Sequence, residues 1–180
     1  MGSPSSETEL HVTPEGQRYE LQSFLGEYHG LLTSIVQRLH EYLQKGTIEN
    51  LLADIDNAFP GVSVAFGEVQ SELNTGRHDS GLQEVALTSE QLKPKLRGFR
   101  FNRRRFYASI TNLPANLSSP RWRTSAKHAM RAVKWGNIIV GSLSKELSKF
   151  RGAEVIKEFG EVMAVTLEQM VDDSEAEESG

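Results

Sequence analysis

Residues 17–44 have the sequence QRYELQSFLGEYHGLLTSIVQRLHEYLQ, in which large apolar residues recur every three or four positions. This spacing places them on one face of an α-helix, and such a face is buried against a core or a partner helix. Gly46 follows the segment and is well suited to stop a helix. The apolar stripe consists of Leu21, Phe24, Tyr28, Leu31, Ile35, Leu39 and Tyr42. A stripe of this length predicts a helical bundle.

The segment after this helix is expected to form two shorter helical pieces. Residues 48–55 carry apolar side chains at helical spacing, and Pro60 with Gly61 is expected to end that helix. Residues 62–73 also fit a helical face, although their first residues alternate as they would in a strand, and we favour the helix. Residues 74–87 are rich in glycine and polar side chains, which indicates a loop.

Three further helices are predicted in the second half of the chain. Residues 88–111 begin with a capping box, and the helix is expected to break or bend at Gly98. Residues 120–150 begin with proline after serine, which is a strong helix-start signal, and Gly152 is expected to end this helix. A last helix carries the apolar residues of the segment 155–170.

These patterns predict an all-α fold, a bundle of about five helices with disordered N- and C-terminal tails. Residues 1–15 contain Gly, Pro and Ser with few large apolar side chains, and the last nine residues contain five acids and no base. The expected organisation is a disordered tail at 1–15, a helical bundle domain at 16–171 and an acidic disordered tail at 172–180.

The composition excludes several classes of protein. A chain of 180 residues with 38% hydrophobic and 24% charged residues is sufficient for one packed domain. The absence of cysteine excludes a disulfide scaffold, thiolate catalysis and a zinc site with cysteine ligands. No apolar run approaches the ~18–20 residues of a membrane-spanning helix, and no secretory signal opens the chain. We therefore expect an intracellular, cytoplasmic domain.

The charges are segregated along the chain. Residues 1–90 carry 14 acids and four bases, residues 91–145 carry no acid and 13 bases, and residues 146–180 carry ten acids and three bases. The three net charges of −10, +13 and −7 give the −4 of the whole chain. Such asymmetry marks a surface for nucleic acid, anionic lipid or an acidic partner, unless acidic and basic helices neutralise one another within the bundle.

The densest basic segment, residues 93–105, contains seven Lys or Arg interleaved with aromatic residues. Arginine binds phosphate or carboxylate bidentately, and aromatic rings stack on bases. In a helix, Arg97, Arg100 and Arg104 share one face with Tyr107. Phe99, Phe106 and Ile110 then point inward. The candidate partner- or anion-binding residues are Arg97, Arg100, Arg103, Arg104, Arg105, Arg123, Lys127 and Arg131.

The last two helices suggest how the basic charge is balanced. The helix from 120 has a basic stripe, and like charges four residues apart repel by about 0.2–0.5 kcal/mol per pair, which favours a negative partner. The last helix has an acidic stripe that can supply it if the two helices pack antiparallel, although exposed pairs contribute only about 0–1 kcal/mol each. The basic stripe is Arg123, Lys127, Arg131 and Lys134, and the acidic stripe is Glu154, Glu158, Glu161 and Glu168.

Catalytic motifs are sparse. The chain has no Gly-rich phosphate loop, no G-x-S-x-G and no two histidines at i,i+4, so we predict neither a cofactor nor a metal. Arg123 and His128 form R-x4-H near the start of the helix from 120, which resembles the signature of HEPN-type ribonuclease domains, a family of all-α bundles. The resemblance implies metal-independent RNA cleavage, usually at a dimer interface. In it, Arg123 would stabilise phosphate charge and His128 would act as general acid or base.

The function expected from the sequence is non-catalytic. We interpret the chain as an adaptor or regulatory interaction module that docks an acidic partner, protein or nucleic acid, through the basic surface between Lys93 and Lys134. One alternative is the HEPN-like ribonuclease. A second alternative is a helical module that binds an anionic membrane, with Trp122 and Trp135 suited to the membrane interface. The heptad-like first helix also permits a homodimer.

Overall fold

The structure is a computed structural model that describes residues 14–43, 49–74, 89–111, 120–146 and 151–179. These residues form five α-helices and no strand, which confirms the predicted all-α bundle. The helices are α2 (Pro14–Leu43), α3 (Glu49–Asn74), α5 (Ser89–Ile110), α6 (Pro120–Glu146) and α7 (Arg151–Ser179). Of the predicted tail at 1–15, residues 1–13 lie outside the described residues, and 14–15 already belong to α2. Of the predicted loop at 74–87, residues 75–87 lie outside the described residues, and residue 74 ends α3.

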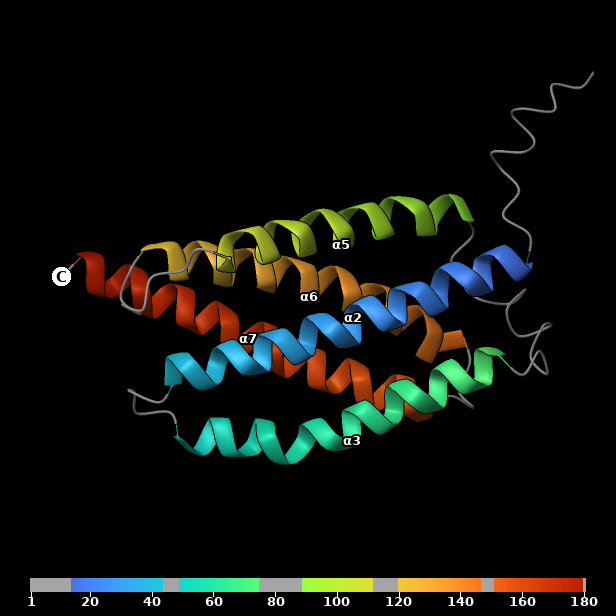
Figure 1. Cartoon of the computed structure of the whole chain (residues 1–180), viewed down its shortest axis with the longest axis horizontal. Helices are drawn as coiled ribbons and strands as arrows, with labels where there is room; N and C mark the ends of the chain where they lie inside the picture. Colours follow the sequence, from blue (N-terminus) through green and yellow to red (C-terminus); the bar gives the residue numbers. More distant parts are fainter. Residues whose placement is uncertain (1–13, 44–48, 75–88, 112–119, 147–150, 180) are drawn as a thin grey trace, which may run out of the picture.

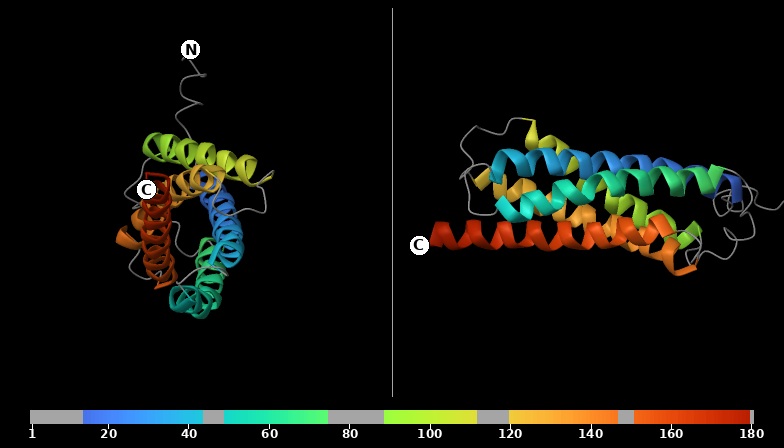
Figure 2. Two further views of the ribbon diagram at one scale, coloured as in Figure 1. Left: turned by 90° about the vertical axis from the view of Figure 1, so that its left-hand side faces the viewer. Right: turned by 90° about the horizontal axis from the view of Figure 1, so that it is seen from below.

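Successive helices run antiparallel along the long axis of the bundle (Figure 1). Helices α2, α6 and α7 form the middle, while α5 packs on α6 and α2, and α3 packs on α7 and α2. Figure 2 shows, in its end view, that α5 and α3 therefore lie at opposite edges of the bundle. The predicted apolar face of α2 is buried from Leu21 to Leu39, because this helix packs on both sides, while the side chain of Tyr42 lies outside the described part.

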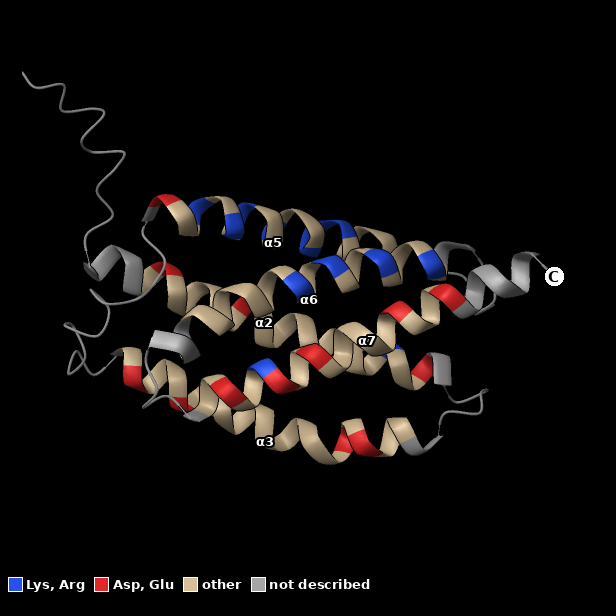
Figure 3. Ribbon diagram, turned by 180° about the vertical axis from the view of Figure 1, so that it is seen from behind, with Lys and Arg blue, Asp and Glu red and all other residues tan. Residues whose placement is uncertain are grey.

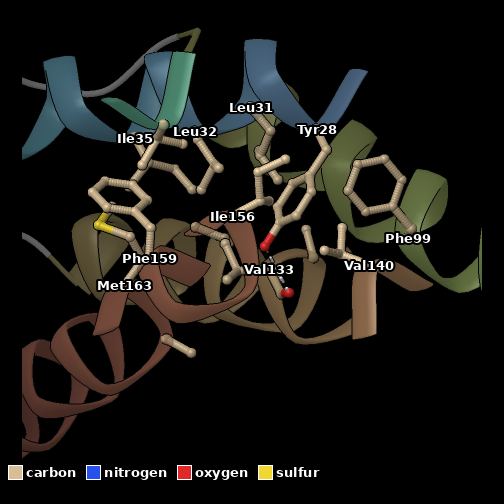
Figure 4. Close-up of a cluster of buried hydrophobic side chains, with 14 of the residues drawn as sticks. Tyr28, Leu31, Leu32, Ile35, Phe99, Val133, Val140, Ile156, Phe159 and Met163 are labelled. Carbon is tan, nitrogen blue, oxygen red and sulfur yellow. Dashed lines mark hydrogen bonds between the residues drawn. The ribbon is translucent and has the colours of Figure 1, made fainter. Parts of the chain in front are cut away.

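Tyr28 joins all five helices at the centre of the core. Its ring, from α2, lies 5.9 Å from the ring of Phe66 in α3 and 5.7 Å from that of Phe99 in α5. Its hydroxyl donates a hydrogen bond of 2.8 Å to Oδ1 of Asn137 in α6, and Asn137 Nδ2 donates one of 3.1 Å to the Lys157 carbonyl in α7. Figure 4 shows Tyr28 reaching from α2 toward Val133 of α6, with Phe99 beside it. Burial raises the pKa of Tyr28, so its hydroxyl remains a neutral donor.

Two glycines that the sequence places at a bend and at a helix end have other positions. Gly98 lies inside the continuous helix α5, and Gly152 is the second residue of α7, while α6 is described only to Glu146. A Cβ on Gly98 of α5 would lie 2.5 Å from Cε2 of Trp135 in α6, so the glycine admits the indole. A Cβ on Gly152 of α7 would lie 2.7 Å from the carbonyl oxygen of Ala65 in α3. The prediction of a break at Gly98 and a stop at Gly152 is therefore wrong, because both residues serve close helix packing.

Pro60 and Gly61 do not end a helix either, since α3 continues through them to Asn74. A proline inside a helix costs about 3 kcal/mol. Ile55 on one side of it and Val62 and Phe66 on the other are each at most 2% exposed. Burying each such side chain contributes about 1.5–3 kcal/mol, and together they outweigh the cost of the proline.

Helix α7 continues to Ser179, past the start of the segment 172–180 that the sequence predicts as an acidic tail. Glutamate and alanine have high helix propensity. A helix that is already packed up to Val171 extends without a new nucleation cost. Helix α7 therefore extends beyond the boundary that the composition predicts at residue 171.

Candidate functional site

Positive charge gathers on the outward sides of two neighbouring helices. Figure 3 shows Lys and Arg concentrated on α5 and α6, and Asp and Glu on α7 and α3. The core-facing positions of these helices match the prediction, since Phe99 and Phe106 of α5 and Val133 of α6 are buried. We call the following residues the basic face: Arg97, Arg104 and Arg105 of α5, with Lys127, Arg131 and Lys134 of α6.

Two of the predicted site arginines have partners within the molecule: Arg100 binds α2, and Arg103 lies over Tyr107 of its own helix. Arg100 Nε and Nη2 donate to the two carboxylate oxygens of Glu27 at 2.9 and 3.1 Å, and Glu20 lies 3.8 Å away. The hydrogen bond with Glu27 raises the pKa of Arg100. Arg103 lies 5.2 Å from the ring centre of Tyr107 and is half-buried. Arg100 therefore fixes α5 to α2, which the linear sequence does not reveal.

The outermost residues of α5 are Arg97, Phe101, Arg104 and Arg105, and we call them the α5 ridge. Phe101 is 54% exposed and lies four residues after Arg97 and three before Arg104, so all three share one face. Arg105 lies 5.7 Å from the Phe101 ring centre. Within the described helices, no carboxylate comes within 4.0 Å of Arg97, Arg104, Arg105 or Arg131. The ridge also borders a groove of ≈ 430 Å³ whose lining includes Glu20, Leu96 and Arg100.

Among the ion pairs between described side chains, one joins the predicted stripes of α6 and α7. These helices pack antiparallel, and Lys134 Nζ lies 3.4 Å from Glu168 Oε2. Both side chains are about half exposed, so the pair contributes little to stability. Among the described residues, Glu154, Glu158 and Glu161 form no ion pair. Most of the acidic stripe is therefore directed to solvent and does not neutralise the basic face.

The two residues of the R-x4-H motif lie apart. Five positions in a helix separate side chains by about 140° around the axis. His128 lies near Arg105 and Arg131, and its buried Nδ1 has no hydrogen-bond partner. Desolvation, followed by the charges of Arg105 and Arg131, lowers the pKa of His128. The charges that act on His128 are thus those of Arg105 and Arg131.

The two tryptophans assigned to a membrane interface lie in the bundle. Trp122 is 6% exposed, and Trp135 is half-buried against Gly98. None of the described helices combines the length and hydropathy needed to cross a bilayer. In the described part of the chain, no group of three or more His, Asp or Glu residues is placed to hold a metal ion.

The stability of the bundle should decrease on acidification from pH 7.5 to about 5.5. Burial lowers the pKa of His29, which hydrogen-bonds Ser63 at 2.9 Å and stacks on Phe66, and the pKa of His128 is lowered as well. Below their ordinary pKa of 6.5, the unfolded chain binds protons that the folded chain does not, so unfolding becomes easier. Urea titrations at the two pH values measure this decrease.

Replacing both histidines by glutamine should reduce that pH dependence, because the proton-binding groups are removed. An unchanged slope in the His29→Gln, His128→Gln variant would show that other groups cause it.

Sequence reasoning missed the exposure of Phe101 and the carboxylates that hold Arg100. The exposure was detectable, because a helical wheel puts Phe101 on the same side as Arg97 and opposite Phe99. The contact with Glu27 depends on how α2 packs, for which the sequence has no local signal.

Comparison with models of known families, with curated proteins and with solved structures finds no match to this chain.

Proposed function

We propose that this chain is a non-catalytic adaptor or regulatory module that docks an acidic protein surface on its basic face. The observation that carries the proposal is the α5 ridge, where exposed arginines that have no carboxylate partner among the described residues flank the exposed ring of Phe101. Arginine and aromatic residues are enriched at the centres of protein interfaces.

Keeping the α5 ridge exposed costs the folded chain free energy, through charge repulsion and through apolar surface left in water. Arg104 and Arg105 are adjacent on α5, and Arg105 and Arg131 both lie near His128 across the α5–α6 boundary. Within the described residues, no carboxylate lies within 4.0 Å of these arginines to offset their repulsion. Phe101 leaves more than half of its surface in water. An acidic partner with an apolar centre relieves both costs, because its carboxylates pair with the arginines and its apolar side chains cover the ring.

An acidic protein is favoured over nucleic acid by what borders the basic face. Glu20 lines the groove beside the ridge, and Glu168 lies at the outer edge of α6. Fixed carboxylates at these places repel a continuous phosphate backbone, whereas a protein surface can place its own charges between them. One exposed ring on the ridge also offers little for successive bases to stack on.

Reversing the ridge charges should weaken binding of an acidic probe at least about tenfold, which corresponds to ~1.4 kcal/mol. The variant is Arg97→Glu with Arg104→Glu, and fluorescence anisotropy measures its binding to labelled polyglutamate. The probe has about 20 residues so that it can span the ~33 Å of α5. The control is Arg38→Glu, which reverses an exposed-surface charge of α2 outside the basic face and should bind as the wild type does.

A polyuridine RNA of similar length decides between the partner classes. We expect it to bind more weakly than polyglutamate at ~200 mM salt. Tighter RNA binding that Arg97→Glu with Arg104→Glu abolishes would replace the protein partner by nucleic acid. The RNA is then inspected for cleavage, and cleavage that His128→Ala abolishes would support the ribonuclease alternative over an adaptor.

A further inference from the structure

A second surface lies between α3 and α7, and it is acidic where the α5 ridge is basic. A groove of ≈ 400 Å³ runs between these helices, and its lining is mostly apolar. Val155 and Val162 of α7 are 42% and 48% exposed there. Asp54 of α3 and Glu158 of α7 are exposed carboxylates in the same lining. This α3–α7 groove thus combines an apolar floor with acidic side chains.

The α3–α7 groove and the α5 ridge lie on opposite sides of the molecule. Helix α3 contains five acids and no base, while α5 contains seven bases and one acid. Because α5 packs on α6 and α2, and α3 on α7 and α2, the two helices occupy opposite edges (Figure 2). They cannot neutralise each other within one molecule, so the bundle is electrically polarised from edge to edge.

The two surfaces match each other in chemistry. The ridge presents an aromatic ring with an arginine before and after it, at Arg97, Phe101 and Arg104. The groove presents apolar side chains with carboxylates on both of its helices, at Asp54 and Glu158. We propose that a second copy of this chain seats its α5 ridge in the α3–α7 groove of the first. The inference rests on the proposed function, because it names the acidic surface that the basic face docks.

Such a contact joins different surfaces of the two copies. The first copy still has a free ridge and the second a free groove, so association continues head to tail into a chain or closes into a ring. One ridge covers less than the ~800 Å² per partner of a standard interface, so we expect micromolar or weaker association. Salt should weaken it further, because exposed charges carry much of the attraction.

Complementary variants test this arrangement in the full chain. The ridge variant is Arg97→Glu with Arg104→Glu, and the groove variant is Asp54→Lys with Glu158→Lys. Sedimentation of the wild type between about 5 and 500 µM at low salt should show a mass that rises with concentration. Each variant alone should remain a monomer, with association weakened at least about tenfold.

Mixing the two variants provides the decisive result. The groove variant retains its ridge and the ridge variant retains its groove, and the two reversed surfaces also carry opposite charges, so an equimolar mixture should regain association with the two variants alternating. Phe101→Ala should weaken wild-type association without a change of charge. Val64→Ala, which removes an exposed side chain of α3 outside the groove lining, should leave it unchanged. Circular dichroism confirms that every variant is helical.

The remaining outcomes separate failure of self-docking from failure of the proposed function. Association that survives in the groove variant would overturn the inference, because another surface then holds the copies together. A monomeric wild type that still binds polyglutamate through Arg97 and Arg104 would overturn self-docking and leave the proposed function standing. A monomeric wild type that binds no polyglutamate either would overturn both.

Discussion

Alanine at position 28 should lower the unfolding free energy of the bundle by about 3–5 kcal/mol, the range for large aromatic residues in cores. Tyr28 is 0% exposed and contacts residues of every other helix, including Phe66, Phe99 and Asn137. Its removal leaves a cavity where the five helices meet and also frees a buried amide. Because domains of this size are stable by only about 5–15 kcal/mol, a measurable unfolded fraction is expected. Urea denaturation monitored by circular dichroism measures the loss.

Two companion variants separate the contributions of the ring and the hydroxyl. Tyr28→Phe retains the ring and leaves Asn137 Oδ1 without its donor, so it should cost about 1–3 kcal/mol. Tyr19→Ala makes the same truncation on the same helix at a side chain that is 69% exposed, and it should have little effect. If Tyr28→Ala were no more destabilising than Tyr19→Ala, Tyr28 would not occupy the centre of the core.

The helices were predictable because their apolar periodicity is a local property of the sequence. The face of α2 that begins at Leu21 and the start of α6 at Pro120 both follow from residues near one another in the chain. The continuity of α3 through Pro60 was not predictable in the same way. It depends on how much apolar surface α2 and α7 bury on either side of the proline, and that is a property of the packed bundle.

The candidate site was predictable only in part for the same reason. The basic charge of α5 is visible in the sequence, and so is the sharing of one face by Arg97 and Arg104. Whether an arginine is held internally depends on a partner far along the chain, as Glu27 is for Arg100 at a separation of 73 residues. The α3–α7 groove is likewise made by two helices that are not consecutive, and neither helix alone indicates it.

Alanine at position 160 should destabilise the bundle by about 2–5 kcal/mol, although alanine normally improves a helix. A Cβ at Gly160 of α7 would collide with Asn137 Oδ1 and would lie 2.6 Å from both Asn137 Cγ and the Tyr28 hydroxyl oxygen. Asn137 has to leave its place, so its bonds to Tyr28 and to the Lys157 carbonyl are both lost. The expected result in a urea titration is a lower midpoint with an unchanged slope.

The same substitution at Gly67 of α3 should have the opposite sign. No atom lies within 4 Å of a Cβ built there, and the residue is exposed. Alanine then only gains helix propensity, and the bundle should become more stable by about 0.4–1 kcal/mol. This contrast tests whether α6 and α7 approach closely through Asn137, since two glycines in separate helix interiors differ only in what faces them. Equal effects at the two positions would mean that Gly160 is not packed against Asn137 and that Tyr28 does not link α2 to α7.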